Sequence, residues 1–169
     1  MEVTADTPGA IEAVRRAARA GAPVGAGTIG SAAEARAFGE AGAAFLVSPG
    51  VMPEVVRVAV ELRLPAVPGA LSPTEIATAL SAGATAVKLF PASLGGPGYL
   101  RVLRGPFSDV RFVPTGGIEL ADVRSWLDAG ATCVGLGSAL VGATPPARSA
   151  DLRVLTERAR RVVRLTGRR

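Results

Sequence analysis

The chain has 169 residues, of which 49% are apolar and 20% charged, and it carries a net charge of +5. This length allows one compact domain with a buried core, and this composition excludes a disordered chain. The absence of histidine and the single cysteine, Cys133, exclude histidine-based triads, histidine-ligated metals, cysteine metal clusters and an intrachain disulfide.

Short apolar runs recur along the chain and predict buried parallel strands. Four of them follow an Ala-Gly-Ala segment, in which the glycine suits the end of a preceding helix. Two further apolar runs and the first residues of the chain bring the number of predicted strands to seven. They lie within residues 2–6, 20–28, 41–50, 64–68, 82–90, 110–114 and 129–138.

Alanine-rich stretches with helical spacing lie between these runs. Ser31, Ser72 and Thr7 precede helical stretches and are candidate N-caps, and Ser72 with Glu75 has the spacing of a capping box. Pro8 and Pro73 stand at first-turn positions. The predicted helices cover residues 8–20, 32–41, 53–62, 73–81, 97–103 and 120–129.

Strict alternation of strand and helix predicts a parallel sheet, either doubly wound or closed into a TIM (β/α)8-type barrel. No strand is followed by a G-x-G-x-x-G fingerprint, which disfavours a dinucleotide fold. Polar residues gather where strands end, as in the active site of a barrel. We therefore expect one barrel domain over residues 1–169, with seven of the eight strands and without the first βα unit.

Lys88 is the only lysine among 19 basic residues, and it lies in the apolar run Val87-Lys88-Leu89-Phe90. An unperturbed lysine is only about 0.04% neutral at pH 7, but desolvation by apolar neighbours lowers its pKa and frees a nucleophilic amine. Such an amine forms a Schiff base with a carbonyl substrate. The alternative is a lysine at a strand end that extends its amine to solvent.

Two glycine-rich turns follow the last two predicted strands, at residues 114–118 and 135–139. Glycines let backbone N–H groups approach an anion, and Ser138 adds a hydroxyl beside the start of a helix. A complete barrel binds phosphate in the loops after strands seven and eight. We expect a phosphate site here, the alternative being glycines that only allow tight turns.

A Schiff-base lysine needs a proton carrier, and in a chain without histidine we expect a carboxylate in this role. Glu2, Asp6, Glu75 and Glu119 lie in strands or loops. Glu75 suits a helix cap, and Glu119 suits the first turn of a helix. Glu2 shares a strand face with Thr4, but its position alone favours a frayed terminus without a role.

Several motifs occur in the order and spacing of a known family. They are Gly25-Ala26-Gly27-Thr28, Leu46-Val47-Ser48-Pro49-Gly50, Val67-Pro68-Gly69, Ser72-Pro73-Thr74-Glu75, Val87-Lys88-Leu89-Phe90-Pro91-Ala92, Gly105-Pro106-Phe107 and Pro114-Thr115-Gly116-Gly117-Ile118. From residue 2 to about residue 141, the chain resembles the 2-keto-3-deoxy-6-phosphogluconate / 4-hydroxy-2-oxoglutarate aldolases. The resemblance implies a class I aldolase, a lyase that forms a trimer of barrels and needs no metal or other cofactor.

The resemblance also implies roles for individual residues. Lys88 matches the Schiff-base lysine, and Glu2 matches the acid/base glutamate, which reverses the preference for a frayed terminus. At Asp6 the family has an arginine that contacts the pyruvate carboxylate, so the charge here is reversed. The remaining matches are to substrate-binding positions: Thr28, Pro49, Phe90 and Thr115 around the keto acid, and Gly116, Gly117, Gly137 and Ser138 around the phosphate.

The expected substrate is thus a small phosphorylated keto acid, cleaved to pyruvate and glyceraldehyde 3-phosphate in the Entner–Doudoroff route. Cleavage of 4-hydroxy-2-oxoglutarate or the 6-phosphogalactonate epimer is an alternative, as is a barrel that binds phosphate without catalysis. The resemblance implies a homotrimer. We expect it in the cytoplasm, because the chain shows no signal peptide or membrane-spanning stretch.

Eight arginines and only two acids predict a basic C-terminal helix over residues 145–169. Such a helix could meet nucleic acid or an anionic surface. No aromatic residues that could stack on bases accompany the arginines, so we expect a solvated helix face and no nucleic-acid partner.

Overall fold

The computed structural model describes residues 1–142 and 149–167, which fall into two compact units, Met1–Phe90 and Pro91–Arg169. We call them unit 1 and unit 2 and describe each by itself. The predicted helix over 145–169 is observed as α8, and its predicted residues 145–148 and 168–169 lie outside the described residues.

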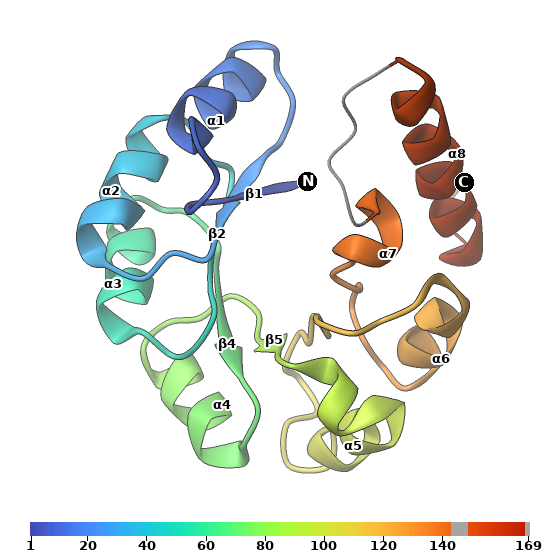
Figure 1. The fold of residues 1–169 in the computed structure, drawn as a ribbon. Coiled ribbons are helices and arrows are strands. Elements are labelled where there is room, and N and C mark those ends of the chain that lie inside the picture. Colours follow the sequence, from blue (N-terminus) through green and yellow to red (C-terminus); the bar gives the residue numbers. More distant parts are fainter. Residues whose placement is uncertain (143–148, 168–169) are drawn as a thin grey trace. The chain divides into compact units, whose positions relative to one another are not determined.

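Unit 1 alternates strand and helix without exception (Figure 1). Its five strands pair in parallel in the order β1-β2-β3-β4-β5, as expected for strands joined by helical crossovers. The elements are β1 (Glu2–Thr4), α1 (Ala10–Arg19), β2 (Gly25–Gly27), α2 (Ala32–Glu40), β3 (Leu46–Ser48), α3 (Pro53–Glu61), β4 (Ala66–Ala70), α4 (Pro73–Ser81) and β5 (Lys88–Leu89).

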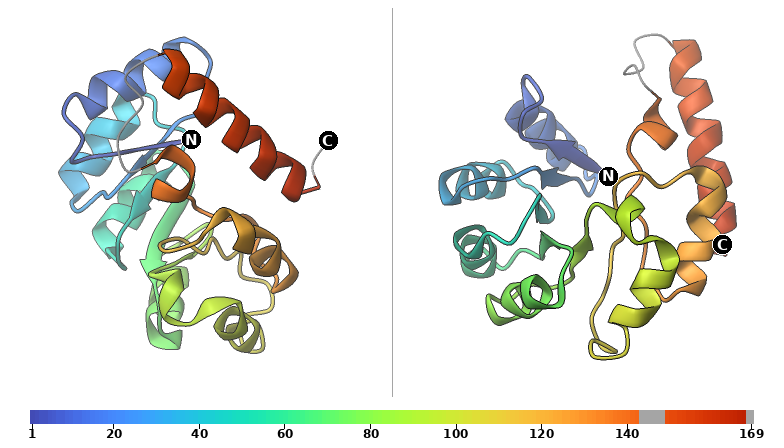
Figure 2. Two further views of the ribbon diagram at one scale, coloured as in Figure 1. Left: turned by 45° about the vertical axis from the view of Figure 1, so that its right-hand side comes forward. Right: turned by 60° about the horizontal axis from the view of Figure 1, so that its bottom comes forward.

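The four helices of unit 1 lie along one side of its strands (Figure 2). Strand residues such as Ala26, Leu46 and Ala66 join helix residues such as Val14 and Phe38 in a buried core. Burial of this apolar face is the main force that holds helices and sheet together. The opposite face of the sheet is not part of this core, and it carries the polar side chains described below.

Two of the three predicted N-caps are confirmed. The Ser31 hydroxyl accepts a hydrogen bond from the Glu34 amide at 3.2 Å, and Ser72 and Glu75 form the predicted capping box. Thr7 does not cap α1: this helix begins at Ala10 after Gly9, and the Thr7 hydroxyl pairs with that of Thr4 at 2.9 Å instead.

Unit 2 consists mainly of helices and turns. No continuous strand forms at 110–114 or 129–138, but the two segments pair in part: Thr115 and Gly135 form a parallel bridge, and the Thr132 amide donates to the Phe112 carbonyl at 2.9 Å. Pro114 has no N–H for a strand ladder, and glycines at 116, 117, 135 and 137 favour turns. The elements are η1 (Ala92–Leu94), α5 (Gly96–Leu103), η2 (Leu120–Asp122), α6 (Val123–Asp128), α7 (Ser138–Val141) and α8 (Ser149–Leu165).

Candidate active site

The strand register of unit 1 places Glu2 and Lys88 on one face of the sheet. Glu2 pairs with Gly25 and Lys88 pairs with Gly69, and paired residues of parallel strands point to the same side. Following the pairs from β1 to β5 puts both side chains opposite the helix-covered face. The two residues with proposed roles in covalent and proton-transfer chemistry therefore share a face, although they come from the two outermost strands.

Lys88 is buried, with 9% of its surface exposed. Burial lowers the pKa of its amine, because the charged form loses hydration, while the negative charge of Glu2 opposes this shift. Its Nζ lies 4.6 Å from the centre of the Phe90 ring, which also favours the ammonium form. Burial prevails, so a larger fraction of Lys88 is neutral than in a solvated lysine.

The pKa of Glu2 shifts in the opposite direction from that of Lys88. Partial burial of its carboxyl group raises the pKa of Glu2, while the charges of Lys88 and the chain's amino group lower it. The residue as a whole is exposed, so solvent reaches it. A carboxyl group with a raised pKa can both donate and accept a proton closer to neutral pH than an ordinary glutamate.

Thr28 follows β2 directly and adopts a left-handed backbone conformation, with φ of 58°. For a β-branched residue this conformation is a genuine outlier and costs roughly 1–3 kcal/mol. Ile29, the next residue, is fully buried and donates its amide to the Val47 carbonyl at 3.0 Å. The chain thus holds Thr28 in a strained turn between two anchored segments, with its side chain exposed.

Pro49 lies at the end of β3, in close contact with β4. A Cβ atom added to Gly69 would collide with the Pro49 carbonyl, so the two backbones touch where Gly69 has no side chain. Lys88 pairs with this same Gly69 from the other side. The Pro49 carbonyl thus fills the space above Gly69, and β4 separates Pro49, after β3, from Lys88 in β5.

Unit 2 contains the glycine turns predicted to bind phosphate. Gly116 and Gly117 have φ of 92° and 72°, a tight turn that L side chains rarely adopt. The bridge from Thr115 to Gly135 brings this turn beside the second one, in which Gly137 precedes α7 and Ser138 is exposed. Thr115 donates its hydroxyl to the Val113 carbonyl at 3.1 Å.

Ser93 is a further polar residue at the predicted phosphate site, and the sequence did not predict it. A Cβ atom on Gly117 would lie 2.7 Å from the Ser93 Cβ and 3.0 Å from its Oγ, so this hydroxyl lies against the glycine turn. The Ser93 amide donates to the Gly116 carbonyl at 3.1 Å. Its position just after Pro91-Ala92 was the only signal in the sequence, and its contact with residues 116–117 arises from folding.

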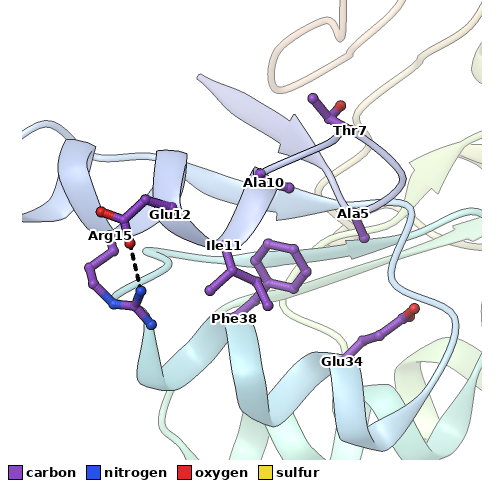
Figure 3. Close-up of a pocket in the computed structure, with 9 residues that line it drawn as sticks. Ala5, Thr7, Ala10, Ile11, Glu12, Arg15, Glu34 and Phe38 are labelled. Carbon is purple, nitrogen blue, oxygen red and sulfur yellow. Dashed lines mark hydrogen bonds and ion pairs between the residues drawn. The ribbon is translucent and has the colours of Figure 1, made fainter.

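A cavity of about 480 Å³ opens in unit 1 between α1 and α2 (Figure 3). Neither Glu2 nor Lys88 lines it. Its polar groups already have partners: Glu12 pairs with Arg15 at 2.7 Å, and Glu34 accepts from the Gly30 amide at 2.8 Å. The cavity therefore lies apart from the predicted catalytic residues.

The described residues hold no cluster of three or more acidic or cysteine side chains that could bind a metal ion. Among the helices of residues 1–142 and 149–167, none is long and apolar enough to cross a membrane.

Comparisons with known proteins find similarity to a family of aldolases. A family model described as KDPG and KHG aldolase matches residues 1–154. The 2-dehydro-3-deoxy-phosphogluconate aldolase of Pseudomonas aeruginosa is 39% identical over 130 residues, which cover 75% of this chain and 59% of that protein. The 2-dehydro-3-deoxy-6-phosphogalactonate aldolase of Escherichia coli is 38% identical over 118 residues, covering 69% and 58%. The chain thus spans less than two thirds of the length of these relatives.

A solved structure shows the same fold. The KDPG aldolase of Legionella pneumophila, with pyruvate captured as a covalent carbinolamine intermediate, superimposes with a TM-score of 0.78 at 30% identity. The match covers 97% of this chain and 77% of that one. This likeness and the parallel sheet confirm the predicted barrel-type α/β fold.

Proposed function

The chain belongs to the KDPG and KHG aldolase family, and from this premise we propose that it is a class I aldolase. It cleaves a 2-keto-3-deoxy-6-phospho sugar acid to pyruvate and glyceraldehyde 3-phosphate. Lys88 is the residue that forms the Schiff base, and Glu2 carries the protons. The reaction needs no metal.

The first half of the reaction makes the covalent intermediate. The neutral Lys88 amine attacks the C2 carbonyl of the keto acid, and the resulting carbinolamine takes up a proton from solvent and loses water to give a protonated imine. Glu2 then accepts the proton of the C4 hydroxyl, directly or through water. The C3–C4 bond breaks, its electron pair moves onto the imine nitrogen, and glyceraldehyde 3-phosphate leaves.

The second half releases pyruvate. An enamine of pyruvate remains on Lys88, and Glu2, now protonated, returns its proton to C3. This regenerates the protonated imine, which water hydrolyses to pyruvate and the free amine, with release of a proton to solvent. The raised pKa of Glu2 and the lowered pKa of Lys88 suit these roles, because each group exchanges a proton nearer neutrality than its ordinary value allows.

One observation carries this proposal: the only lysine of the chain is buried on the sheet face that also bears Glu2. The carbinolamine reported for the Legionella relative supports a lysine of this kind as the nucleophile. Phe90, whose ring contacts the amine, supplies an apolar wall for the pyruvyl group, and Thr28 and Pro49 complete the keto-acid contacts.

The phosphate is assigned to unit 2. Gly116, Gly117 and Gly137 offer backbone N–H groups, and Ser138 offers an exposed hydroxyl, while Thr115 contacts the pyruvyl end. The similarity to a 6-phosphogalactonate aldolase makes that C4 epimer a second candidate substrate. A panel with the gluconate-derived acid, its galactonate epimer and 4-hydroxy-2-oxoglutarate separates the candidates by kcat/KM.

The proposal includes the assembly and the setting of the enzyme: a homotrimer in the cytoplasm that acts in the Entner–Doudoroff route. Two apolar side chains of unit 2 support self-association: Leu94 is 71% exposed and Val102 is 70% exposed. Light scattering coupled to gel filtration measures the mass of the protein in solution, and the mass of a monomer would overturn the proposed trimer.

Borohydride reduction in the presence of pyruvate tests the catalytic proposal. The wild-type protein should gain one reduced pyruvyl group, located by peptide mass spectrometry on Lys88. Lys88→Arg should lose both the adduct and pyruvate release from the phosphorylated substrate. Lys88→Arg combined with Arg101→Lys is the matched control, because it restores one lysine at an exposed position of α5 and should stay inactive.

An unmodified wild-type protein, or an adduct confined to the amino terminus, would remove the catalytic role of Lys88. Binding of phosphate without pyruvate release would instead favour the non-catalytic barrel.

A further inference from the structure

The side chain of Glu2 does not lie over its own register partner. Glu2 pairs with Gly25, yet its carboxyl group occupies the space above Gly27, two residues further along β2. A Cβ atom on Gly27 would collide with the Glu2 Oε1 and lie 2.9 Å from its Cγ. The carboxyl group thus leans toward the end of the strands where Thr28 follows.

An aromatic ring accounts for this direction. The space above Gly25 is taken by Phe45, whose ring atom Cδ2 would lie 2.5 Å from a Cβ atom at that position, with two other ring atoms closer still. Phe45 precedes β3, the neighbour of β2 in the sheet. The two glycines of β2 therefore leave room for different side chains, Gly25 for the ring and Gly27 for the carboxyl group.

We infer that Gly27 and Phe45 are positioning residues for Glu2, which fix where its carboxyl group stands for proton transfer. This inference rests on the proposed function, since it assumes that Glu2 moves the protons of the aldol cleavage. Phe45 blocks the position beside Gly25, and the missing side chain of Gly27 opens the next one. Neither residue is required to touch the substrate.

The surroundings of the carboxyl group agree with this arrangement. Burial is the largest influence on the pKa of Glu2 and raises it. The same placement keeps Glu2 in electrostatic contact with Lys88. A carboxyl group moved off Gly27 would lose both its direction and part of this environment.

Gly27→Ala is the direct test. The new methyl group needs the space of the carboxyl group, which must move by more than 1 Å, and displacements of this size cost about 100-fold in rate. We expect kcat for cleavage to fall about 100-fold, while borohydride trapping of pyruvate on Lys88 persists. The matched control is Gly98→Ala, since Gly98 is exposed and its added methyl group meets nothing within 4 Å.

A double substitution separates positioning from general damage. If Gly27 acts through Glu2, adding Gly27→Ala to Glu2→Gln should change kcat by less than about 3-fold, since the carboxylate that it positions is already gone. A purely structural role predicts that the 100-fold loss appears in both backgrounds. The pH profile of kcat should also change in Gly27→Ala, because Glu2 enters a different environment.

Phe45→Leu is a second test of the same positioning role, for use if the Gly27→Ala variant does not fold. Leucine retains apolar volume but leaves part of the space above Gly25 open, so the carboxyl group gains a second position. We expect kcat to fall about 10-fold with little change in KM, and again only when Glu2 is present. Thermal melting of each variant shows whether it is folded.

The outcomes distinguish this inference from the function on which it rests. If the wild-type protein traps no pyruvate on Lys88, the proposed function fails. If the wild type traps pyruvate and cleaves substrate, but Gly27→Ala and Phe45→Leu keep wild-type kcat and pH profile, the positioning role is overturned. Equal losses with and without the Glu2 carboxylate would overturn it as well.

Discussion

The two units of the chain support their candidate residues in different ways. In unit 1, Glu2 and Lys88 stand within paired strands, so the ladder of backbone hydrogen bonds sets the direction of each side chain. In unit 2, the candidate groups stand in turns, around the bridge from Thr115 to Gly135. Proton and covalent chemistry demands tight geometry, which strands provide, whereas an anion can be held by backbone N–H groups of a glycine turn.

The largest effect should come from Glu2→Gln in unit 1. General acid–base catalysis contributes roughly 10²–10⁴-fold, so kcat for cleavage should fall by that factor. Trapping of pyruvate on Lys88 should continue, because attack by the amine needs no proton from Glu2. A steady-state assay of pyruvate release and a trapping assay on the same preparation measure both. Unchanged kcat would mean that the strand face of unit 1 does not carry the proton transfer.

A smaller effect is expected from Ser138→Ala in unit 2. One hydrogen bond to a charged group contributes about 1.5 kcal/mol, so KM for the phosphorylated substrate should rise about 10-fold. Trapping of pyruvate, which has no phosphate, should be unaffected. Ser125→Ala, at another exposed serine of unit 2, is the control. An equal rise in KM for phosphorylated and unphosphorylated substrates would contradict the assignment of phosphate binding to unit 2.

The pH dependence of pyruvate trapping tests the electrostatic coupling between Glu2 and Lys88 in unit 1. The trapping rate should rise with pH as the Lys88 amine loses its proton, at a pKa below the ordinary 10.5. The negative charge of Glu2 raises the pKa of Lys88, so Glu2→Gln should move this rise to lower pH. Glu54→Gln, an exposed acid on α3, should leave it in place. A shift to higher pH would contradict the coupling.

The smallest effect concerns stability alone. Arg63 follows α3 with φ of 58°, at a position where α1, α2, α4 and α6 are followed by glycine. A left-handed conformation costs an L residue about 1 kcal/mol or more, so Arg63→Gly should raise the free energy of unfolding by roughly 0.5–1 kcal/mol. Arg57→Gly, inside α3, should lower it by about 1 kcal/mol. Denaturant melts measure both, and destabilisation by Arg63→Gly would contradict the argument.

Local patterns predicted much of unit 1. The capping box of Ser72 and Glu75 depends on residues three positions apart, and the Glu75 carboxylate indeed accepts from the Ser72 and Leu71 amides. These hydrogen bonds lower the pKa of Glu75, which suits a structural acid rather than a proton carrier. In unit 2 the prediction of continuous strands at 110–114 and 129–138 was wrong: the two segments share only a few backbone hydrogen bonds, and Pro114 has no N–H with which to extend the ladder.

The amino-acid sequence by itself determined the alternation of strands and helices in unit 1 and the choice of Lys88, because these depend on composition and spacing along the chain. It also determined the family, through its similarity to known aldolases. The roles of Glu2 and Lys88 stay predictions. Tertiary structure alone decided that Glu2 shares a face with Lys88 and lies over Gly27, since register sets which way a strand side chain points. It also decided that Ser93 meets the Gly117 turn, because no local pattern encodes contacts between distant segments.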